Sequence, residues 1–238
     1  MKNIYADILL SKSQNKKLLA ILLDPDKIIW ETLDFLALKI NESPATHILI
    51  GGSRVLSNKM DELILRIKQS CTLPIILFPG NPSQISDKAD GILFLSLISG
   101  RNPDYLIGHQ VAAAPVLKRT NLEVIPTGYI LIGKSNESAV SIVSKTLPLC
   151  QNNTDEIVHT AQAGEMLGKK LIYLEAGSGA KDKVAPHIIN EVSRHIEIPL
   201  IVGGGIMARG EIAEAYRAGA DMVVIGTAFE NDFNFFDI

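Results

Sequence analysis

The sequence predicts an α/β fold, a single (β/α)₈ barrel (TIM barrel) that spans residues 1–238. Eight short runs rich in Ile, Leu and Val recur along the chain, and segments with apolar residues at helical spacing separate most of them. Runs that are apolar on both faces are typical of buried parallel strands, and alternating strands and helices imply a parallel sheet. Eight such units in 238 residues fit a closed barrel.

The expected elements follow from these patterns. We expect strands at residues 18–24, 46–53, 73–79, 91–96, 122–133, 170–179, 199–205 and 221–227. Helical spacing occurs at residues 27–40, 59–69, 103–117, 155–167, 185–195 and 209–217. Only residues 81–89 join the third and fourth strands, so the third helix is expected to be short or missing. The long segment 134–169 has room for two helical pieces, at 137–145 and 155–167.

Composition excludes several classes of protein. The net charge of −3 predicts no nucleic-acid partner, because such proteins carry a basic face. Cys71 and Cys150 lie far apart without a C-x-x-C spacing, which favours reduced thiols and a cytoplasmic location. No signal-peptide core is present, and no apolar run approaches the roughly 18 residues that span a bilayer. A substrate drawn from a membrane surface, with peripheral membrane contact, stays open.

Glycine clusters end the last three predicted strands, at residues 177–179, 203–205 and 226–227. Glycine lets backbone N–H groups approach an anion, and the loops after strands seven and eight are the recurrent phosphate site of such barrels. The alternative is that these glycines only form tight turns. Their succession at three strand ends favours a bound phosphate.

Two carboxylates are expected at the same end of the barrel. Asp24 ends the first strand and Ser53 the second, and hard oxygen ligands of this kind suit Mg²⁺. The alternative is that residues 24–26 form a turn that caps a helix. Glu175 ends the sixth strand, on the same face as Tyr173, and could orient or deprotonate a hydroxyl. A structural salt bridge is the alternative for Glu175.

Six motifs, in order along nearly the whole chain, resemble the geranylgeranylglyceryl phosphate synthase family. They are LLDPDK (22–27), ILIGGS (48–53), PTGY (126–129), YLEAGSGA (173–180), IVGGGI (201–206) and VVIGT (223–227). PTGY and YLEAGSG mark a branch with archaeal and bacterial members. The resemblance implies a prenyltransferase that joins the prenyl (geranylgeranyl) group of a prenyl diphosphate to the C3 hydroxyl of sn-glycerol 1-phosphate. It also implies the loss of a regular third helix.

The resemblance also implies roles for individual residues. Mg²⁺ is the expected cofactor, with Asp24 and Ser53 as its metal positions, and Asp24 and Glu175 are the expected catalytic residues. The expected glycerol phosphate site comprises Tyr173, Leu174, Glu175, Ala176, Gly177, Ser178, Gly179, Gly203, Gly204, Gly226 and Thr227. Tyr129, Ile130 and the apolar helix at 106–117 are candidate walls of a trough for the prenyl tail.

Two features depart from or add to this pattern. Some members carry a basic residue two positions before the aspartate of the first strand, where this chain has Leu22. An anion contact there must come from elsewhere, such as Lys27 or the main chain. The chain ends in ENDFNFFDI, which leaves little room for a final helix. An exposed FNFF end would favour a homo-oligomer that covers it.

Three other functions compete with this interpretation. An isomerase or cyclase acting on a sugar phosphate needs an acid and a base at opposite strand ends, yet strands three and four end in Pro79 and Ser96. A flavin-binding barrel would use similar glycine loops, and the colour of the purified protein would reveal it. A non-catalytic phosphate-binding protein would gain nothing from Asp24 and Glu175 at the mouth.

Overall fold

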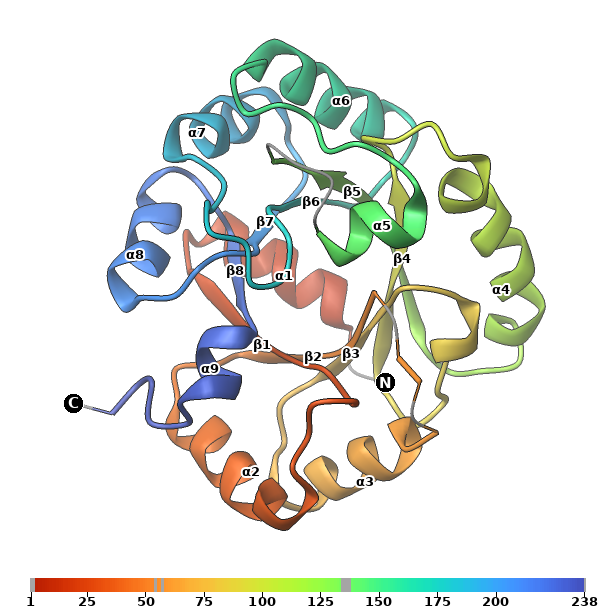
Figure 1. Cartoon of the computed structure of the whole chain (residues 1–238), viewed down its shortest axis with the longest axis vertical. Helices are drawn as coiled ribbons and strands as arrows, with labels where there is room; N and C mark the ends of the chain where they lie inside the picture. The colour runs from red at the N-terminus through yellow and green to blue at the C-terminus, as the bar shows by residue number, and fades with distance from the viewer. Residues whose placement is uncertain (1–2, 54, 57, 134–137, 238) are drawn as a thin grey trace.

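The computed structural model describes residues 3–53, 55, 56, 58–133 and 138–237. Within these residues eight parallel strands close into one barrel in the order β1 to β8, with β8 pairing back onto β1. The strands are β1 Leu18–Leu23, β2 His47–Gly52, β3 Ile75–Pro79, β4 Gly91–Leu97, β5 Glu123–Leu131, β6 Leu171–Glu175, β7 Leu200–Gly203 and β8 Met222–Ile225. The predicted TIM barrel is confirmed, and Figure 1 shows its ring of surrounding helices.

Helices connect the strands around the outside. They are α1 Ile4–Ser13, α2 Leu33–Glu42, α3 Met60–Ser70, α4 His109–Leu117, α5 Ala139–Ser144, α6 Thr154–Met166, α7 Pro186–His195, α8 Arg209–Arg217 and α9 Thr227–Asn231. Pro186 begins α7, where a missing N–H costs nothing, and Asn153 caps α6 by accepting a hydrogen bond from the Glu156 N–H. None of the helices in the described ranges is long and apolar enough to cross a membrane.

One connection agrees with the expectation and two differ from it. Between β3 and β4 the described chain forms only a single 3₁₀ turn, Pro82–Gln84. The third helix of the barrel pattern, which would follow β3, is therefore missing as expected, and the helix labelled α3 lies between β2 and β3. The predicted helix at 27–40 starts later, because residues 24–29 form a turn and loop and a 3₁₀ turn at Trp30–Thr32 precedes α2. Of the expected piece 137–145, residue 137 lies outside the described residues and α5 covers the rest only to Ser144.

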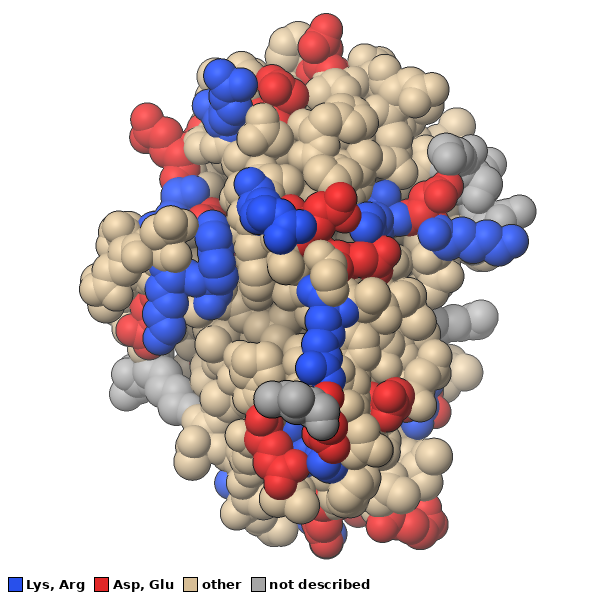
Figure 2. Space-filling view, turned by 90° about the vertical axis from the view of Figure 1, so that its left-hand side faces the viewer, with Lys and Arg blue, Asp and Glu red and all other residues tan. Residues whose placement is uncertain are grey.

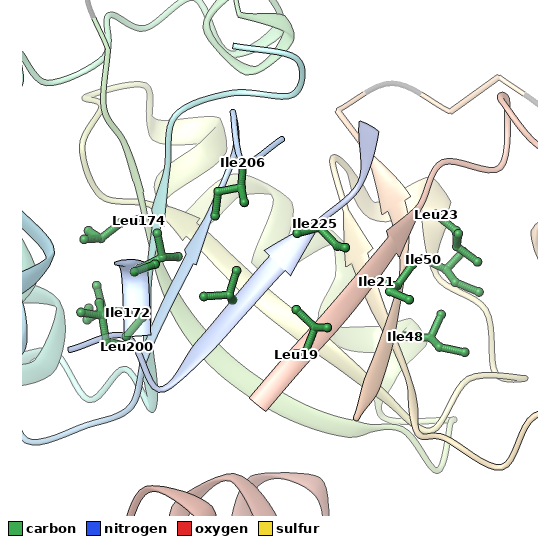
Figure 3. Packing of buried hydrophobic residues seen from close by; sticks show 14 of the residues in the cluster. Leu19, Ile21, Leu23, Ile48, Ile50, Ile172, Leu174, Leu200, Ile206 and Ile225 are labelled. Atoms are coloured by element: carbon green, nitrogen blue, oxygen red, sulfur yellow. The ribbon is translucent and has the colours of Figure 1, made fainter. Parts of the chain in front are cut away.

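Two apolar layers hold the barrel together. Alternate residues of each strand point outward against the helices, as Leu19, Ile21 and Leu23 do on β1 (Figure 3). The others point inward, where Phe78, Tyr129 and further side chains fill the barrel interior. Strands buried on both faces explain why the sequence shows continuous apolar runs instead of alternation.

Helix α1 closes the barrel end at which the strands begin. Ile4 and Ile8 are buried in the interior cluster, and the Glu123 carboxylate at the start of β5 accepts hydrogen bonds from the N–H groups of Ile4 and Tyr5. Figure 1 shows α1 across the far end of the barrel, opposite α5 and α9. The barrel end at which the strands finish is the one that α1 leaves uncovered.

The C-terminal segment corrects one expectation. Phe233, Phe235 and Phe236 are partly buried and pack against the barrel's own outer layer. Phe233 lies 6.2 Å from Phe35 of α2 and 5.9 Å from Phe229 of α9, measured between ring centroids. The FNFF end is therefore not an exposed apolar tail, and it supplies no argument for an oligomer.

Charged side chains of both signs are mixed on the face that carries α7 and α8. Figure 2 shows Lys and Arg side chains lying beside Asp and Glu side chains on this face. Lys183, for example, forms ion pairs with Glu211 at 3.0 Å and with Glu214 at 2.7 Å. Neither sign dominates this part of the surface.

Candidate active site

A cavity of about 330 Å³ opens where the barrel strands end. Residues after β1, β2, β6, β7 and β8 line it, which places it at the end used by barrel enzymes. It brings together residues that lie far apart in the sequence, such as Asp24 and Glu230, which are 206 positions apart. Most of the predicted site residues thus line one cavity.

The glycine-rich corner of this cavity is built from three neighbouring loops. Ser178 and Gly179 follow β6, Gly204 and Gly205 follow β7, and Gly226 with Thr227 follows β8. Gly204 has φ +80°, a conformation that disfavours a side chain. A Cβ at Gly204 would also overlap the Glu175 carboxylate, and one at Gly203 would overlap the Tyr173 hydroxyl. Gly203 and Gly204 therefore make room for the Tyr173 and Glu175 side chains, and do more than form turns.

Glu175 is the buried carboxylate of the site. Its side chain lines the cavity and is only 5% exposed, and its Oε1 accepts a 2.7 Å hydrogen bond from the Gly177 N–H. Burial raises the pKa of Glu175 to about 7, while the Gly177 N–H and the hydroxyls of Tyr173 and Tyr129 oppose that rise. No described lysine or arginine forms an ion pair with it, so the structural salt bridge considered above is absent among the described residues. A carboxylate that titrates near neutrality suits proton transfer.

Three aromatic rings form the floor beneath Glu175. Tyr173 and Tyr129 lie 5.3 Å apart, Phe78 lies 5.3 Å from Tyr173, and Phe78 lies 5.8 Å from Tyr129, between ring centroids. Burial also raises the pKa of both tyrosines well above the usual value, which keeps them protonated. Among the described residues the buried Tyr173 hydroxyl lacks a hydrogen-bond partner of normal geometry. It is therefore available to a ligand in the cavity.

Asp24 stands across the cavity, at the end of β1. Its Oδ1 accepts a 3.1 Å hydrogen bond from the Asp26 N–H, which matches the turn considered above, yet the carboxylate also lines the cavity. Its own N–H donates to Oε1 of Glu230 in α9 at 3.1 Å. Ser53 lines the same space from the end of β2.

This corner fits a magnesium ion held jointly with a substrate. The donors that face the cavity here are the Asp24 and Glu230 carboxylates and the Ser53 hydroxyl, all hard oxygen atoms. Among the described residues there is no cluster of three metal-binding side chains, so a closed protein cage is not built. Mg²⁺ typically uses one or two protein carboxylates together with substrate phosphates, which matches this donor set.

A second, apolar cavity of about 90 Å³ adjoins the first. Both cavities are lined by Gly52, Ser53, Phe78, Tyr129 and Val140. The second passes between the 3₁₀ turn that replaces the third helix and α4, whose Gln110 and Ala113 form one wall. The missing helix thus opens a trough that begins at the polar mouth.

The structure separates the predicted site residues into those that face the mouth and those that support it. Tyr173, Glu175, Ser178, Gly179, Gly204, Gly226, Thr227, Asp24 and Ser53 line the large cavity. Leu174 points outward beside Ile172 and Leu200 (Figure 3), so only its backbone is available to the site. Ala176, Gly177 and Gly203 shape the loops around the cavity without lining it.

Some expectations about the trough change, and some lining residues were not foreseen. Tyr129 lines it as expected, but Ile130 is buried in the outer layer and does not. Glu230 was missed because ENDFNFFDI, the sequence after β8, carries no pattern that shows where the Glu230 side chain points. Phe78 could have been found, since it lies two residues after the inward-facing Ile76 of β3.

Comparison with known proteins agrees with this site. A model of the PcrB family matches residues 12–237. The geranylgeranylglyceryl phosphate synthase of Flavobacterium johnsoniae is 64% identical over 237 residues, covering 100% of this chain and 98% of that protein. The enzyme of the same name from Thermococcus kodakarensis is 40% identical, covering 92% of this chain and 86% of the relative.

Solved structures give the same result. A structure of (S)-3-O-geranylgeranylglyceryl phosphate synthase from Thermoplasma acidophilum in complex with sn-glycerol-1-phosphate has a TM-score of 0.93, with 33% identity over 100% of this chain and 95% of that chain. The α-subunit of tryptophan synthase from Pyrococcus furiosus, at 15% identity and a TM-score of 0.59, shares only the fold. The resemblance seen in the motifs is confirmed: the chain belongs to the PcrB family, together with proteins named geranylgeranylglyceryl phosphate synthase.

Proposed function

We propose that this protein is a prenyltransferase that joins the geranylgeranyl group of its diphosphate to the C3 hydroxyl of sn-glycerol 1-phosphate. The products are an ether lipid phosphate and diphosphate. The observation that carries the proposal is that the two cavities adjoin, since the polar cavity lined by glycines, Glu175 and Asp24 shares part of its wall with an apolar trough. A polar phosphate substrate and an apolar tail can then meet at one point.

The competing functions fit this geometry less well. A sugar-phosphate isomerase has no use for an apolar trough that leaves its active site. At the ends of β3 and β4, Pro79 lines the trough and Ser96 is buried beside the Lys169 ammonium, at 2.7 Å, so neither serves as acid or base at the mouth. A mere phosphate-binding protein would not need a buried carboxylate whose pKa lies near 7.

Glycerol phosphate binding uses the glycine-rich corner. Gly179, Gly204 and Gly226 line this corner without side chains, so a phosphate can approach the backbone N–H groups there. Thr227 adds a hydroxyl at the same corner. With the phosphate fixed there, the glycerol hydroxyls extend toward the Glu175 carboxylate and the Tyr173 hydroxyl.

Proton transfer is assigned to Glu175. In its ionised form the carboxylate accepts the proton of the C3 hydroxyl as the oxygen bonds to the allylic carbon. The C–O bond to the diphosphate breaks in the same substitution, and the pair of electrons leaves with the diphosphate. The Gly177 N–H holds Oε1 at 2.7 Å, which orients the carboxylate before the substrate binds.

The diphosphate is assigned to the corner at Asp24 and Ser53. Mg²⁺, when bound with the substrate, supplies neutralising charge for the leaving diphosphate. Asp24, with Ser53 beside it, would hold that ion, and Asp24 is fixed through its N–H by Glu230. The allylic end of the prenyl chain then lies at the junction of the two cavities, and its tail follows the trough past Tyr129 and Ala113.

Membrane contact is a further part of the proposal, because the product is a lipid. Single apolar side chains are exposed on the segments that follow β1, β4, β5 and β7, namely Ile29, Ile107, Ile142 and Met207, two of them on helical turns. Such residues could dip into a bilayer surface while a cytoplasmic protein stays peripheral. Flotation with anionic lipid vesicles tests this, and an Ile29→Asp/Ile142→Asp variant that floats as well as the wild type would count against it.

A homo-oligomer also stays part of the proposal. Val111 and Val116 are exposed on α4 and are suited to a contact between copies. We expect light scattering to give a mass above the 25.9 kDa of one chain. A monomer at micromolar concentration would remove this part without affecting the reaction.

Product formation tests the proposed reaction. Incubation with Mg²⁺, glycerol 1-phosphate and radiolabelled prenyl diphosphates of several lengths should give labelled lipid phosphate in a butanol extract. The product should disappear with the folded Asp24→Ala variant. If folded wild-type protein forms no product with any chain length, the proposed function is wrong and only a phosphate-binding barrel remains.

A further inference from the structure

Lys27 lies between two carboxylates at the mouth of the cavity. Its Nζ is 3.1 Å from Oε2 of Glu230 and 3.7 Å from Oδ2 of Asp24. Lys27 follows β1 in the same turn as Asp24, whereas Glu230 comes from α9 after β8, the strand paired with β1. The ammonium therefore occupies the position that a cation would take between these two groups.

The two carboxylate oxygens of Glu230 accept hydrogen bonds from different residues. Oε1 accepts the Asp24 N–H at 3.1 Å, and Oε2 accepts the Lys27 ammonium. The Glu230 side chain is 13% exposed and the Asp24 side chain 22%, so both carboxylates are mostly removed from water. One ammonium facing two carboxylates leaves this corner with a net negative charge, which attracts a further cation.

Lys27 is also the cationic side chain that lines the large cavity in the described part of the chain. The proposed reaction needs two anionic groups in that cavity, a phosphate and a diphosphate. Glycine backbone groups serve the phosphate corner, and Leu22 supplies no charge beside Asp24. The Lys27 side chain is 48% exposed, and an ion pair so accessible to water is weak enough to open and close readily.

We propose that Lys27 is a diphosphate-binding residue and that Glu230 is its positioning residue. Before the substrate binds, Lys27 holds the two carboxylates together. When the diphosphate arrives with its divalent cation, Lys27 leaves Asp24 for the diphosphate oxygens, and Glu230 keeps Asp24 in place through its N–H. The inference rests on the proposed function, since it assigns a diphosphate to this corner.

Two binding measurements test the proposed role of Lys27, and the Lys27→Met variant should change the two affinities in opposite directions. In calorimetry with inorganic diphosphate and Mg²⁺, we expect Lys27→Met to weaken binding at least about tenfold, the effect of losing one charge-assisted hydrogen bond. Lys27→Arg should restore most of it. In titrations with Mn²⁺ alone, Lys27→Met should tighten binding because the competing ammonium is gone, whereas Glu230→Gln should weaken it. A purely structural role for Lys27 would not tighten binding of a cation.

Lys39→Met is the matched control, because Lys39 also contacts two carboxylates, Asp237 at 2.8 Å and Glu42 at 3.2 Å, outside the cavity. It should leave diphosphate and Mn²⁺ binding unchanged. If Lys27→Met binds diphosphate as tightly as the wild type does, and the wild type forms product, the inference about Lys27 is wrong and the proposed function stands. Failure of the wild type both to form product and to bind diphosphate would remove the proposed function as well.

Discussion

Gly204 lies against Glu175 at the centre of the site. Because Gly204 has no side chain, the Glu175 carboxylate has room beside it. A Cβ on Gly204 would overlap Oε1 of Glu175, and the backbone there has φ +80°. Glu175 itself pairs in register with Gly203, the preceding residue. The glycine loop after β7 and the carboxylate of β6 therefore form one unit.

Gly204→Ala should destabilise the folded protein by more than backbone strain alone would. Gly168 has a similar φ of +83°, but a Cβ there would meet no atom within 4 Å, so Gly168→Ala reports the backbone strain by itself. We expect about 1 kcal/mol of destabilisation for Gly168→Ala and about 1–3 kcal/mol more for Gly204→Ala. Denaturant unfolding measures both. Only Gly204→Ala should also lose binding of glycerol 1-phosphate, and equal binding in the two variants would contradict the role of Gly204.

Glu175 should make the protein less stable as the pH rises. The pKa of its carboxyl is about 7 in the folded protein and 4.5 in an unperturbed chain, so the folded state binds more protons between these values. Ionisation therefore costs stability progressively from pH 4.5 to 7, by at most roughly 3 kcal/mol.

Glu175→Gln removes this dependence while keeping an oxygen that accepts the Gly177 N–H. The free energy of unfolding of the variant should exceed that of the wild type by an amount that grows from near zero below pH 4.5 to a maximum above pH 7. Urea unfolding at several pH values measures this difference. A difference that does not change with pH would mean that burial does not raise the pKa of Glu175.

The same carboxyl should shape the pH dependence of the reaction. Because the ionised form accepts the hydroxyl proton, kcat/KM of the wild type should fall below about pH 7, the pKa of Glu175. Glu175→Gln should lower kcat by about 10²–10⁴-fold and remove that acid limb. Calorimetric binding of glycerol 1-phosphate over the same pH range separates titration of the substrate from titration of Glu175. An acid limb that persists in the variant would assign the base elsewhere.

Filling the trough should shorten the preferred prenyl chain. Ala113 lines the apolar cavity, whereas its neighbour Ala112 on α4 is exposed. Ala113→Leu should lower the ratio of turnover with a long diphosphate to turnover with a short one by at least about tenfold, since poor accommodation of a few methylenes costs that much. Ala112→Leu, the control, should leave the ratio unchanged. If both variants keep the wild-type ratio, the tail does not occupy this cavity.

The sequence predicted the framework of this site because strand burial and glycine turns leave local signals. Residues 200–202 and 222–225 are apolar up to the glycines that follow them, so the strand ends and the glycine-rich corner could be placed from the sequence. The missing third helix could be predicted from the length of the β3–β4 connection alone.

Other features depend on contacts that have no local signal. Helix α1 was not predicted, since it is fixed by Ile4 and Ile8 entering the barrel and by Glu123, more than 100 positions away. Phe233 packs on Phe35 of α2, which is far away in the sequence, so the sequence alone could not show that the tail is covered. Glu230 faces Asp24 only because β8 pairs with β1 when the barrel closes.

Enantiomer choice is the most direct test of the central claim. Folded wild-type protein with Mg²⁺ and geranylgeranyl diphosphate should convert sn-glycerol 1-phosphate into an ether lipid phosphate that mass spectrometry identifies, and should convert the sn-3 enantiomer far more slowly. That result would show that the phosphate corner and Glu175 together present one hydroxyl to the prenyl chain. No ether product from either enantiomer, or equal conversion of both, would contradict the account.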